Sequence, residues 1–279
     1  RKSSWAIGFG LALPSDSGQV TVTLPDADSS AWYMEHNMAR DTFMIWITSP
    51  DVYNRDLVDA ILTFPFTDST GAITERTDTI SFRYMKPAAP RGGTGKTQGL
   101  NITTNISGKI RPGTMPSFKS ATPLAEPDTS RIRLTQTVDS VQKSLPYQIV
   151  RDSVSSRLLL LKASLEPGAT YSLICSQGAF RDIFGMASDS VAYRITVATA
   201  EDYGSIKVML AGYEGRVIIQ LTTDRDKVIR EASLISPGEV FFPLLDKGRY
   251  RLKAVYDLDS DGKWTTGDFN FGRMPEPVT

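Results

Sequence analysis

The chain has 279 residues, and its 31 Lys and Arg are balanced by 31 Asp and Glu, so the formal net charge is zero. Proteins that bind DNA or RNA usually carry a basic surface, so no nucleic-acid partner is expected. A single cysteine excludes an intrachain disulfide and a thiolate zinc site, and a single histidine excludes the multi-histidine centres of catalytic zinc. No apolar run approaches the roughly 18 residues that a membrane-spanning helix needs.

The first segment, Arg1–Leu13, places two basic residues before the apolar stretch WAIGFGLAL. A secretory signal would end in a cleavage site with small residues, and no such site follows, so the segment is predicted to be a strand. Because the chain begins with Arg inside strand-like sequence, we expect it to be a piece of a longer protein.

Short strand-like segments fill most of the chain. They are rich in β-branched and aromatic residues and are separated by clusters of Gly, Pro, Asp and Ser, which is typical of antiparallel sandwiches. The clearest are Thr42–Thr48, Leu57–Phe66, Asp78–Tyr84, Leu100–Ile106, Arg157–Ala163, Tyr171–Cys175 and Val191–Val197. The sequence therefore predicts an all-β fold of tandem antiparallel β-sandwiches. Helix is considered only for Asn54–Leu62, which competes with a strand, and for Ala179–Phe184.

Two breaks in the pattern predict three domains. The segment Lys86–Gly99 is dense in Pro and Gly, and Thr199–Gly204 is a shorter polar break. The predicted domains are residues 1–86, 97–200 and 203–279, with residues 87–96 as a linker. The second and third domains each place a glycine turn before a Tyr-x-Leu strand, at Tyr171 and at Tyr250.

The strongest local motif is the acidic loop Asp257–Asp268. Acidic residues at positions 1, 3, 5 and 12 and Gly262 at position 6 match the spacing of a calcium-binding loop, in which position 7 contributes its backbone carbonyl. The predicted ligands are Asp257, Asp259, Asp261, Lys263 and Asp268. Position 12 is Asp rather than Glu and a strand enters the loop, so the alternative is a metal-free turn whose carboxylates cap backbone amides. An ion bound here is expected to be structural Ca²⁺.

No set of residues predicts catalysis, and the chain is not expected to be an enzyme. The segment Gly93–Thr97 ends like a phosphate-binding loop, but Pro90 occupies the place of the motif's first glycine and a strand follows, so a linker is predicted. His36 has no G-x-S-x-G serine to activate. Cys175 ends the strand-like YSLIC and is predicted to be a buried apolar residue.

Aromatic residues concentrate in the first predicted domain, at Trp5, Trp32, Tyr33, Trp46 and Tyr53. Trp46 lies within an apolar strand and is predicted to be buried. Trp32 and Tyr33 stand beside polar residues and are predicted to lie on the surface, where such rings can stack on sugars or contact a partner protein.

Three segments of the second domain, Leu165–Tyr171, Phe180–Gly185 and Ala192–Thr199, resemble the closing half of a bacterial Ig-like domain of the S-layer type. The loop Asp257–Gly267 resembles the C-terminal part of Ig-like-domain lipoproteins of Bacteroidota, whose tails read D-x-N-x-N-G-K-W-D-T-G. In this chain Asp replaces both Asn residues and Thr replaces the Asp that follows Trp. Asp41–Trp46 and Thr77–Ile80 are also similar to the middle region of that family.

The resemblance implies a further Ig-like domain and a lipid-modified cysteine upstream, a transthyretin-like C-terminal sandwich, and residence at the outer membrane. The function it favours is a non-enzymatic envelope scaffold, such as an accessory subunit of an outer-membrane protein assembly or transport complex. The expected partners are outer-membrane or periplasmic proteins, and the membrane is contacted only through the lipid anchor. The alternative is a surface module that binds or processes glycans.

Overall fold

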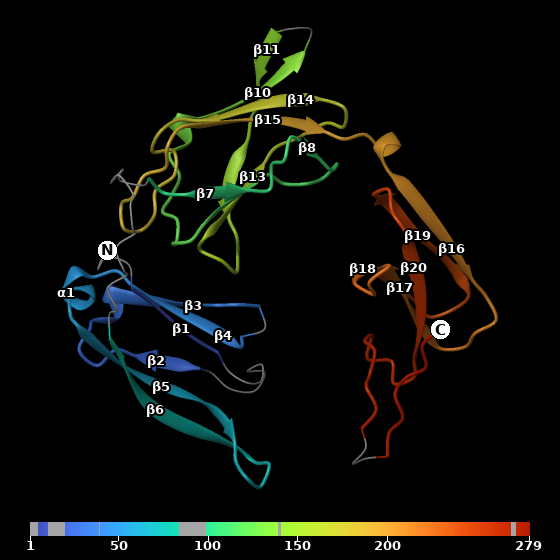
Figure 1. The fold of residues 1–279 in the computed structure, drawn as a ribbon, viewed down its shortest axis with the longest axis horizontal. Coiled ribbons are helices and arrows are strands. Elements are labelled where there is room, and N and C mark those ends of the chain that lie inside the picture. Colours follow the sequence, from blue (N-terminus) through green and yellow to red (C-terminus); the bar gives the residue numbers. More distant parts are fainter. Residues whose placement is uncertain (1–4, 11–19, 39, 84–98, 139–140, 269–271) are drawn as a thin grey trace, which may run out of the picture. The chain divides into compact units, whose positions relative to one another are not determined.

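The computed structural model describes residues 5–10, 20–38, 40–83, 99–138, 141–268 and 272–279. Almost all regular structure in these residues is strand, and the strands form tandem antiparallel β-sandwiches, which confirms the predicted fold class (Figure 1). The chain divides into two compact units, Arg1–Val197 and Ala198–Thr279. The predicted linker 87–96 and the glycine-rich Gly93–Thr97 lie outside the described residues.

The first sandwich consists of two three-stranded sheets, in the orders β1-β4-β3 and β2-β5-β6. In the central strand β4, Ile45 and Ile47 point into the core between the sheets, where they are fully buried. The strands are β1 (Trp5–Gly10), β2 (Thr21–Thr23), β3 (Trp32–His36), β4 (Thr42–Ile47), β5 (Leu57–Thr67) and β6 (Ile73–Arg83), with the 3-10 turn η1 (Ser29–Ala31) before β3.

The one α-helix of the described residues, α1 (Pro50–Tyr53), was not predicted. It begins with a proline in its first turn, where the missing N–H costs nothing, and its Val52 is buried in the core. The segment Asn54–Leu62, for which helix and strand compete in the sequence, enters strand β5 from Leu57 onward. Burial of Val58, Ala60 and Leu62 at every second position favours the strand.

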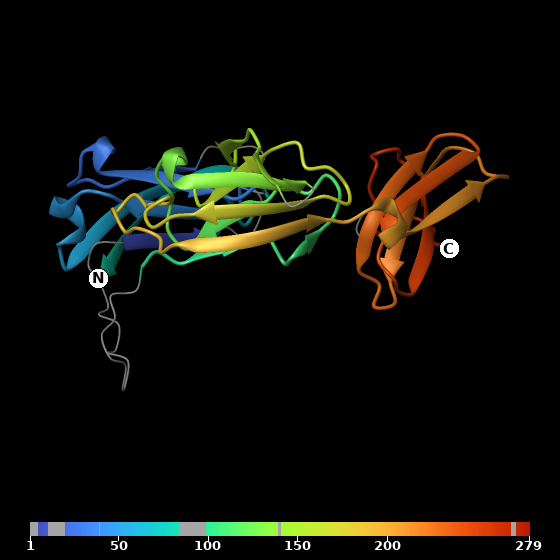
Figure 2. The same ribbon diagram turned by 90° about the horizontal axis from the view of Figure 1, so that it is seen from above.

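The second sandwich pairs a five-stranded sheet, β11-β10-β14-β15-β8, with a four-stranded sheet, β12-β13-β9-β7. β14 and β15 run side by side in both views, and β8 joins β15 as a parallel edge strand (Figures 1 and 2). The elements are β7 (Ile102–Thr104), β8 (Lys109–Ile110), β9 (Ser117–Ser120), η2 (Thr129–Arg131), β10 (Ile132–Val138), β11 (Val141–Ser144), β12 (Gln148–Arg151), β13 (Leu158–Lys162), β14 (Thr170–Cys175) and β15 (Val191–Val197).

The segment Ala179–Phe184 is not a helix. The buried carboxylate of Asp182 accepts hydrogen bonds from the amides of Phe184 (3.0 Å) and Met186 (2.8 Å), which closes a tight turn instead. A short acidic side chain competes with helical hydrogen bonding in this way, because it satisfies the amides that a helix would pair with carbonyls.

The third sandwich, residues 198–279, packs the two-stranded sheet β16-β19 against the three-stranded sheet β18-β17-β20. Its core includes Val217, Ile219 and Leu221 of the central strand β17. The elements are η3 (Ala200–Asp202), β16 (Gly204–Leu210), β17 (Arg216–Thr223), β18 (Val228–Leu234), β19 (Gly238–Leu245) and β20 (Tyr250–Asp257).

The last residues of the chain run antiparallel to β20. Val278 pairs with Val255, Ala254 and Thr279 exchange backbone hydrogen bonds of 2.8 and 2.9 Å, and the Tyr256 amide donates to the carbonyl of Pro277. This register sets which residues of the tail meet the acidic loop that follows β20.

Candidate functional site

The candidate site lies where β20 ends, between the acidic loop and the tail. Because Val255 pairs with Val278, the residues two positions further along the two segments, Asp257 and Glu276, stand directly opposite one another. Side chains at such positions share a face, with Cβ atoms about 5 Å apart. Both residues are buried, Asp257 to 3% and Glu276 to 6% exposure. The fold therefore places two carboxylates side by side away from solvent.

Glu276 ties the tail to the loop. Its Oε1 accepts from the Leu258 amide at 2.7 Å, and its Oε2 accepts from the Thr265 amide at 2.9 Å. The indole N–H of Trp264 donates to the Glu276 backbone carbonyl at 3.2 Å. One tail residue thus satisfies three donors of the loop.

Asp257 is only half satisfied. Its Oδ2 accepts from the Gly262 amide at 2.9 Å and lies 3.7 Å from Nε of Arg216, a distance beyond hydrogen bonding. Its Oδ1 is buried and has no hydrogen-bond partner among the described residues. Gly262 has φ +81° and a Cβ there would meet Arg216 Nη1 at 3.3 Å, so the turn that delivers this amide requires glycine.

Asp259 completes the group. One oxygen from each of Asp257, Asp259 and Glu276 lies within 4.8 Å of the others, so these residues could hold a metal ion. Asp259 Oδ2 also accepts from the Thr265 hydroxyl at 3.2 Å and lies 3.8 Å from Nη1 of Arg273. Carboxylate oxygens are the ligands that hard cations such as Ca²⁺ prefer.

Two of the five predicted ligands, Asp257 and Asp259, belong to this group. Asp261 does not: its Oδ1 accepts from the Lys263 amide at 2.7 Å, the amide-capping role of the metal-free alternative. Asp268 is also outside the group, and its backbone pairs with Arg273. The carbonyl contribution of Lys263 stays a prediction.

Glu276 was missed because it lies outside the 12-residue loop. A signal was available, since it is the only acidic residue after Asp268. Its meeting with Asp257 depends on the strand register of the tail, which the sequence pattern does not reveal.

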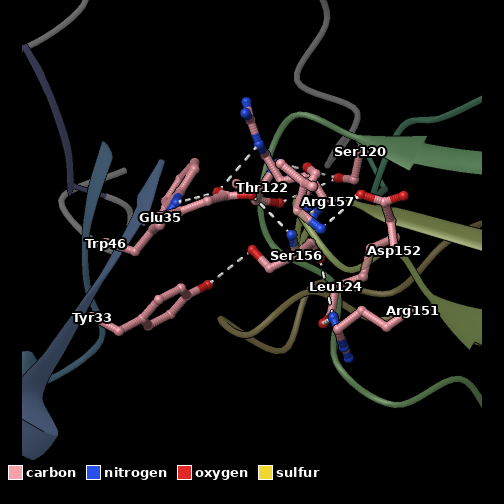
Figure 3. A network of polar contacts seen from close by, with 12 residues as sticks. Tyr33, Glu35, Trp46, Ser120, Thr122, Leu124, Arg151, Asp152, Ser156 and Arg157 are labelled. Atoms are coloured by element: carbon pink, nitrogen blue, oxygen red, sulfur yellow. Dashed lines mark hydrogen bonds and ion pairs between the residues drawn. The ribbon is translucent and has the colours of Figure 1, made fainter. Parts of the chain in front are cut away.

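Another buried carboxylate, that of Glu35, lies where the first two sandwiches of residues 1–197 meet (Figure 3). Trp46 and Tyr33 are paired on the face of β3 and β4 that points away from the Ile45 and Ile47 core. Trp46 is 3% exposed, so its predicted burial is confirmed, but on the outer face of the sheet. Its indole N–H donates to Glu35 Oε2 at 3.0 Å.

The turn between β12 and β13 supplies the other half of this junction. Glu35 Oε1 accepts from the Ser156 amide at 2.8 Å, and Glu35 Oε2 lies 3.5 Å from Nε of Arg157. The guanidinium of Arg157 also lies 5.8 Å from the centre of the Trp46 ring. The Tyr33 hydroxyl is 3.4 Å from the Ser156 hydroxyl, and burial raises the pKa of the Tyr33 phenol above its ordinary value, while the Ser156 hydrogen bond acts in the opposite direction.

The two rings predicted to lie on the surface are only partly exposed. Trp32 packs against the core of the first sandwich, and Tyr33 contributes to the junction. Beside the junction is a hollow of about 510 Å³, whose lining includes Tyr33, His36, Arg40, Arg151 and Asp152.

His36 and Cys175 form no hydrogen bond with another reactive side chain among the described residues. His36 Nδ1 lies 2.8 Å from the carbonyl of Asn37, and its ring meets Phe43 edge-on. Cys175 is fully buried in the second core, as predicted, and burial raises the pKa of its thiol to about 11. A thiol with this pKa is a poor nucleophile near neutral pH.

No family model matches the chain, and no curated protein matches it. Among solved structures, the chain is similar to native alpha-2-macroglobulin from Escherichia coli, in a crystal structure spanning domains MG0-NIE-MG1. The identity is 13%, the match covers 92% of this chain and 90% of that chain, and the TM-score is 0.28. A likeness at this level assigns neither family nor function. No helix among the described residues is long and apolar enough to cross a membrane.

Proposed function

We propose that the chain is part of a non-enzymatic cell-envelope lipoprotein that acts as a scaffold for protein interactions at the outer membrane. An accessory subunit of an outer-membrane assembly or transport complex is the most specific form of this proposal. The family resemblance of the acidic loop and of the second domain supports the location and the lipid anchor. The C-terminal loop, in this proposal, carries a structural Ca²⁺.

The observation that carries the scaffold role is the Glu35 junction. A scaffold holds its domains in a defined orientation, which requires directional contacts between them. From a buried position, Glu35 accepts one hydrogen bond from Ser156 and forms one ion pair with Arg157 across the junction. Trp46, in the same sheet as Glu35, holds the carboxylate from its own side. Polar contacts of this kind favour one arrangement, because leaving the buried Glu35 carboxylate without these partners costs about 1–3 kcal/mol.

Affinity purification from detergent-solubilised membranes after mild cross-linking tests the proposal. We expect the native protein to be recovered with envelope proteins in fixed proportion. A Glu35→Ala variant should recover less of them at equal abundance, because its two sandwiches are no longer held in one orientation. Glu126→Gln, which changes an exposed carboxylate, is the matched control. Recovery of the native protein alone, at full abundance, would contradict the proposal.

The hollow beside the junction favours one second candidate, a glycan-binding surface module. Its lining combines the Tyr33 ring with the charged groups of Arg40, Arg151 and Asp152, which is the mixture of stacking surface and hydrogen-bonding groups that sugar sites use. A glycan array separates the candidates. Binding that is lost in both Tyr33→Ala and Arg40→Ala supports the module, and binding that is lost only in Trp32→Ala places any sugar elsewhere.

A further inference from the structure

We propose that Asp257, Asp259 and Glu276 bind one divalent cation of the calcium class, and that the ion fastens the chain's tail, residues 272–279, to the acidic loop. The proposal deepens the calcium part of the proposed function and does not depend on the scaffold role. It replaces the consecutive loop ligands Asp261 and Asp268 by a residue of the tail.

The first argument is electrostatic. Like charges directly opposite one another on neighbouring strands are destabilising, and burial raises the cost because water no longer screens them. Asp257 and Glu276 are in this position, and Asp259 adds a third carboxylate. A bound cation removes this repulsion, and it does so only in the folded chain, where the tail has reached the loop.

Two arginines near the group offset part of its negative charge without hydrogen-bonding to it. Arg216 Nε lies 3.7 Å from Asp257 Oδ2 and is itself buried without a hydrogen-bond partner. Arg273 Nη1 lies 3.8 Å from Asp259 Oδ2, and the Arg273 side chain is 62% exposed. Neither arginine forms the short bidentate pair that is the strongest contact between a guanidinium and a carboxylate, and Oδ1 of Asp257 stays without a donor.

The second, independent argument is the Oδ1 atom of Asp257. The Asp257 side chain is fully buried, yet this oxygen has no partner among the described residues, whereas both Glu276 oxygens accept backbone amides. A buried carboxylate oxygen without a donor costs free energy that a metal bond would recover. The atom belongs to the residue that forms the fixed end of the group, at the last position of β20.

The donor set selects the cation. Zinc prefers nitrogen and sulfur ligands, whereas the three residues of this site offer carboxylate oxygens. Magnesium demands near-ideal octahedral geometry and keeps several waters, whereas calcium accepts irregular sets of six to eight oxygens. Calcium therefore suits carboxylates that an irregular loop and a tail strand bring together better than magnesium does.

Calorimetry of the full chain with and without millimolar CaCl₂ provides the test, with MgCl₂ and EDTA in parallel. Calcium at about ten times its dissociation constant should raise the melting temperature of the 198–279 transition by roughly 5–10 °C. Hydrogen exchange should slow at the Leu258 and Thr265 amides, which Glu276 holds. An unchanged transition together with unchanged exchange in calcium would overturn the proposal.

The variant Asp257→Asn gives a result that misfolding cannot imitate. Its amide keeps an acceptor for the Gly262 N–H, and it removes one charge of the repelling group. We therefore expect the variant to melt at or above the wild-type temperature in EDTA but to lose the calcium-induced shift. A variant that keeps the full shift would exclude Asp257 as a ligand.

Three further variants separate this ligand set from the consecutive loop set. Asp261→Asn and Asp268→Asn should retain the calcium shift, while Glu276→Gln should lose it. The opposite pattern would place the ion in the loop alone. If calcium shifts the melting temperature of none of these proteins, the cation proposal fails. The affinity purification that tests the scaffold proposal does not depend on that result, so the two proposals can fail separately.

Discussion

Glu35 contacts both Ser156 and Arg157 across the junction between the first two sandwiches. Glu35→Ala removes the acceptor of the Trp46 indole and of the Ser156 amide and leaves Arg157 without its carboxylate. Breaking a buried charged network of this kind costs about 2–4 kcal/mol. We expect the denaturation midpoint of residues 1–197 to fall accordingly in urea titrations of the full chain.

The control for this loss is Glu126→Gln. Glu126 pairs with Arg151 at 3.2 Å, but its side chain is 89% exposed. Exposed ion pairs contribute only about 0–1 kcal/mol. An equal loss in the two variants would mean that Glu35 acts as an ordinary surface charge.

Cys175 should be chemically inert in the folded chain. Its thiol is fully buried and its pKa is raised to about 11, so thiolate is scarce near neutral pH. We predict that a thiol-specific chromogenic reagent reacts with the chain only after denaturant is added. Fast reaction of the native protein at neutral pH would contradict the burial.

The same thiol makes the free energy of unfolding depend on pH in the alkaline range. Its folded pKa of about 11 lies above the ordinary value of 9.0, so the neutral thiol is favoured in the folded state. The resulting stabilisation is present below pH 9 and is lost as the pH rises toward 11, because the unfolded chain releases its proton first. Comparing chemical denaturation of wild type and Cys175→Ala between pH 8 and pH 11 isolates this slope, which should be shallower in the variant.

At the level of elements, the two Tyr-x-Leu strands begin with similar tyrosine contacts. The Tyr171 hydroxyl accepts from the Glu166 amide at 2.7 Å, and the Tyr250 hydroxyl donates to the Asp246 carbonyl. Each ring thus ties a strand to the turn before it. Tyr171→Phe should lower the free energy of unfolding by about 1–3 kcal/mol, because a partly buried amide loses its acceptor. Tyr250→Phe, at a more exposed site, should cost less, and urea denaturation of both variants measures the difference.

The tail of the third sandwich needs a glycine at position 267. A Cβ there would lie 2.9 Å from Pro275 Cδ and 3.0 Å from the Arg273 carbonyl. Gly267→Ala should therefore push the tail away from the loop, with faster hydrogen exchange at the Thr265 amide. Gly204→Ala, whose new atom would come no closer than 3.8 Å to the Leu245 carbonyl, should leave that exchange unchanged.

Local patterns predicted the strands well. The predicted segment Val191–Val197 coincides with β15, and Leu57–Phe66 differs from β5 by one residue. The patterns failed where a single side chain decides the local structure, as Asp182 does in the turn after β14, and where a proline starts a one-turn helix at Pro50.

For the molecule as a whole, the contacts that matter join residues far apart in the chain. Glu35 meets Ser156 across 121 positions, and Glu276 reaches the Leu258 amide across 18. Periodicity reports which face of a strand is buried, but it does not report which domain or tail covers that face. For this reason the sequence predicted that Trp46 is buried, but it did not predict that Arg157 covers the Trp46 ring. The domain boundaries at residues 86, 97, 200 and 203 stay predictions.

The central claim is that the Glu35 junction holds the first two sandwiches in one orientation. Spin labels at Thr79→Cys and Arg194→Cys, with the native Cys175 too buried to react, allow the distance between the sandwiches to be measured by pulsed electron resonance. We predict one narrow distance distribution in the otherwise wild-type chain and a broad one when Glu35→Ala is added. A broad distribution in both chains, or a narrow one in both, would contradict the claim.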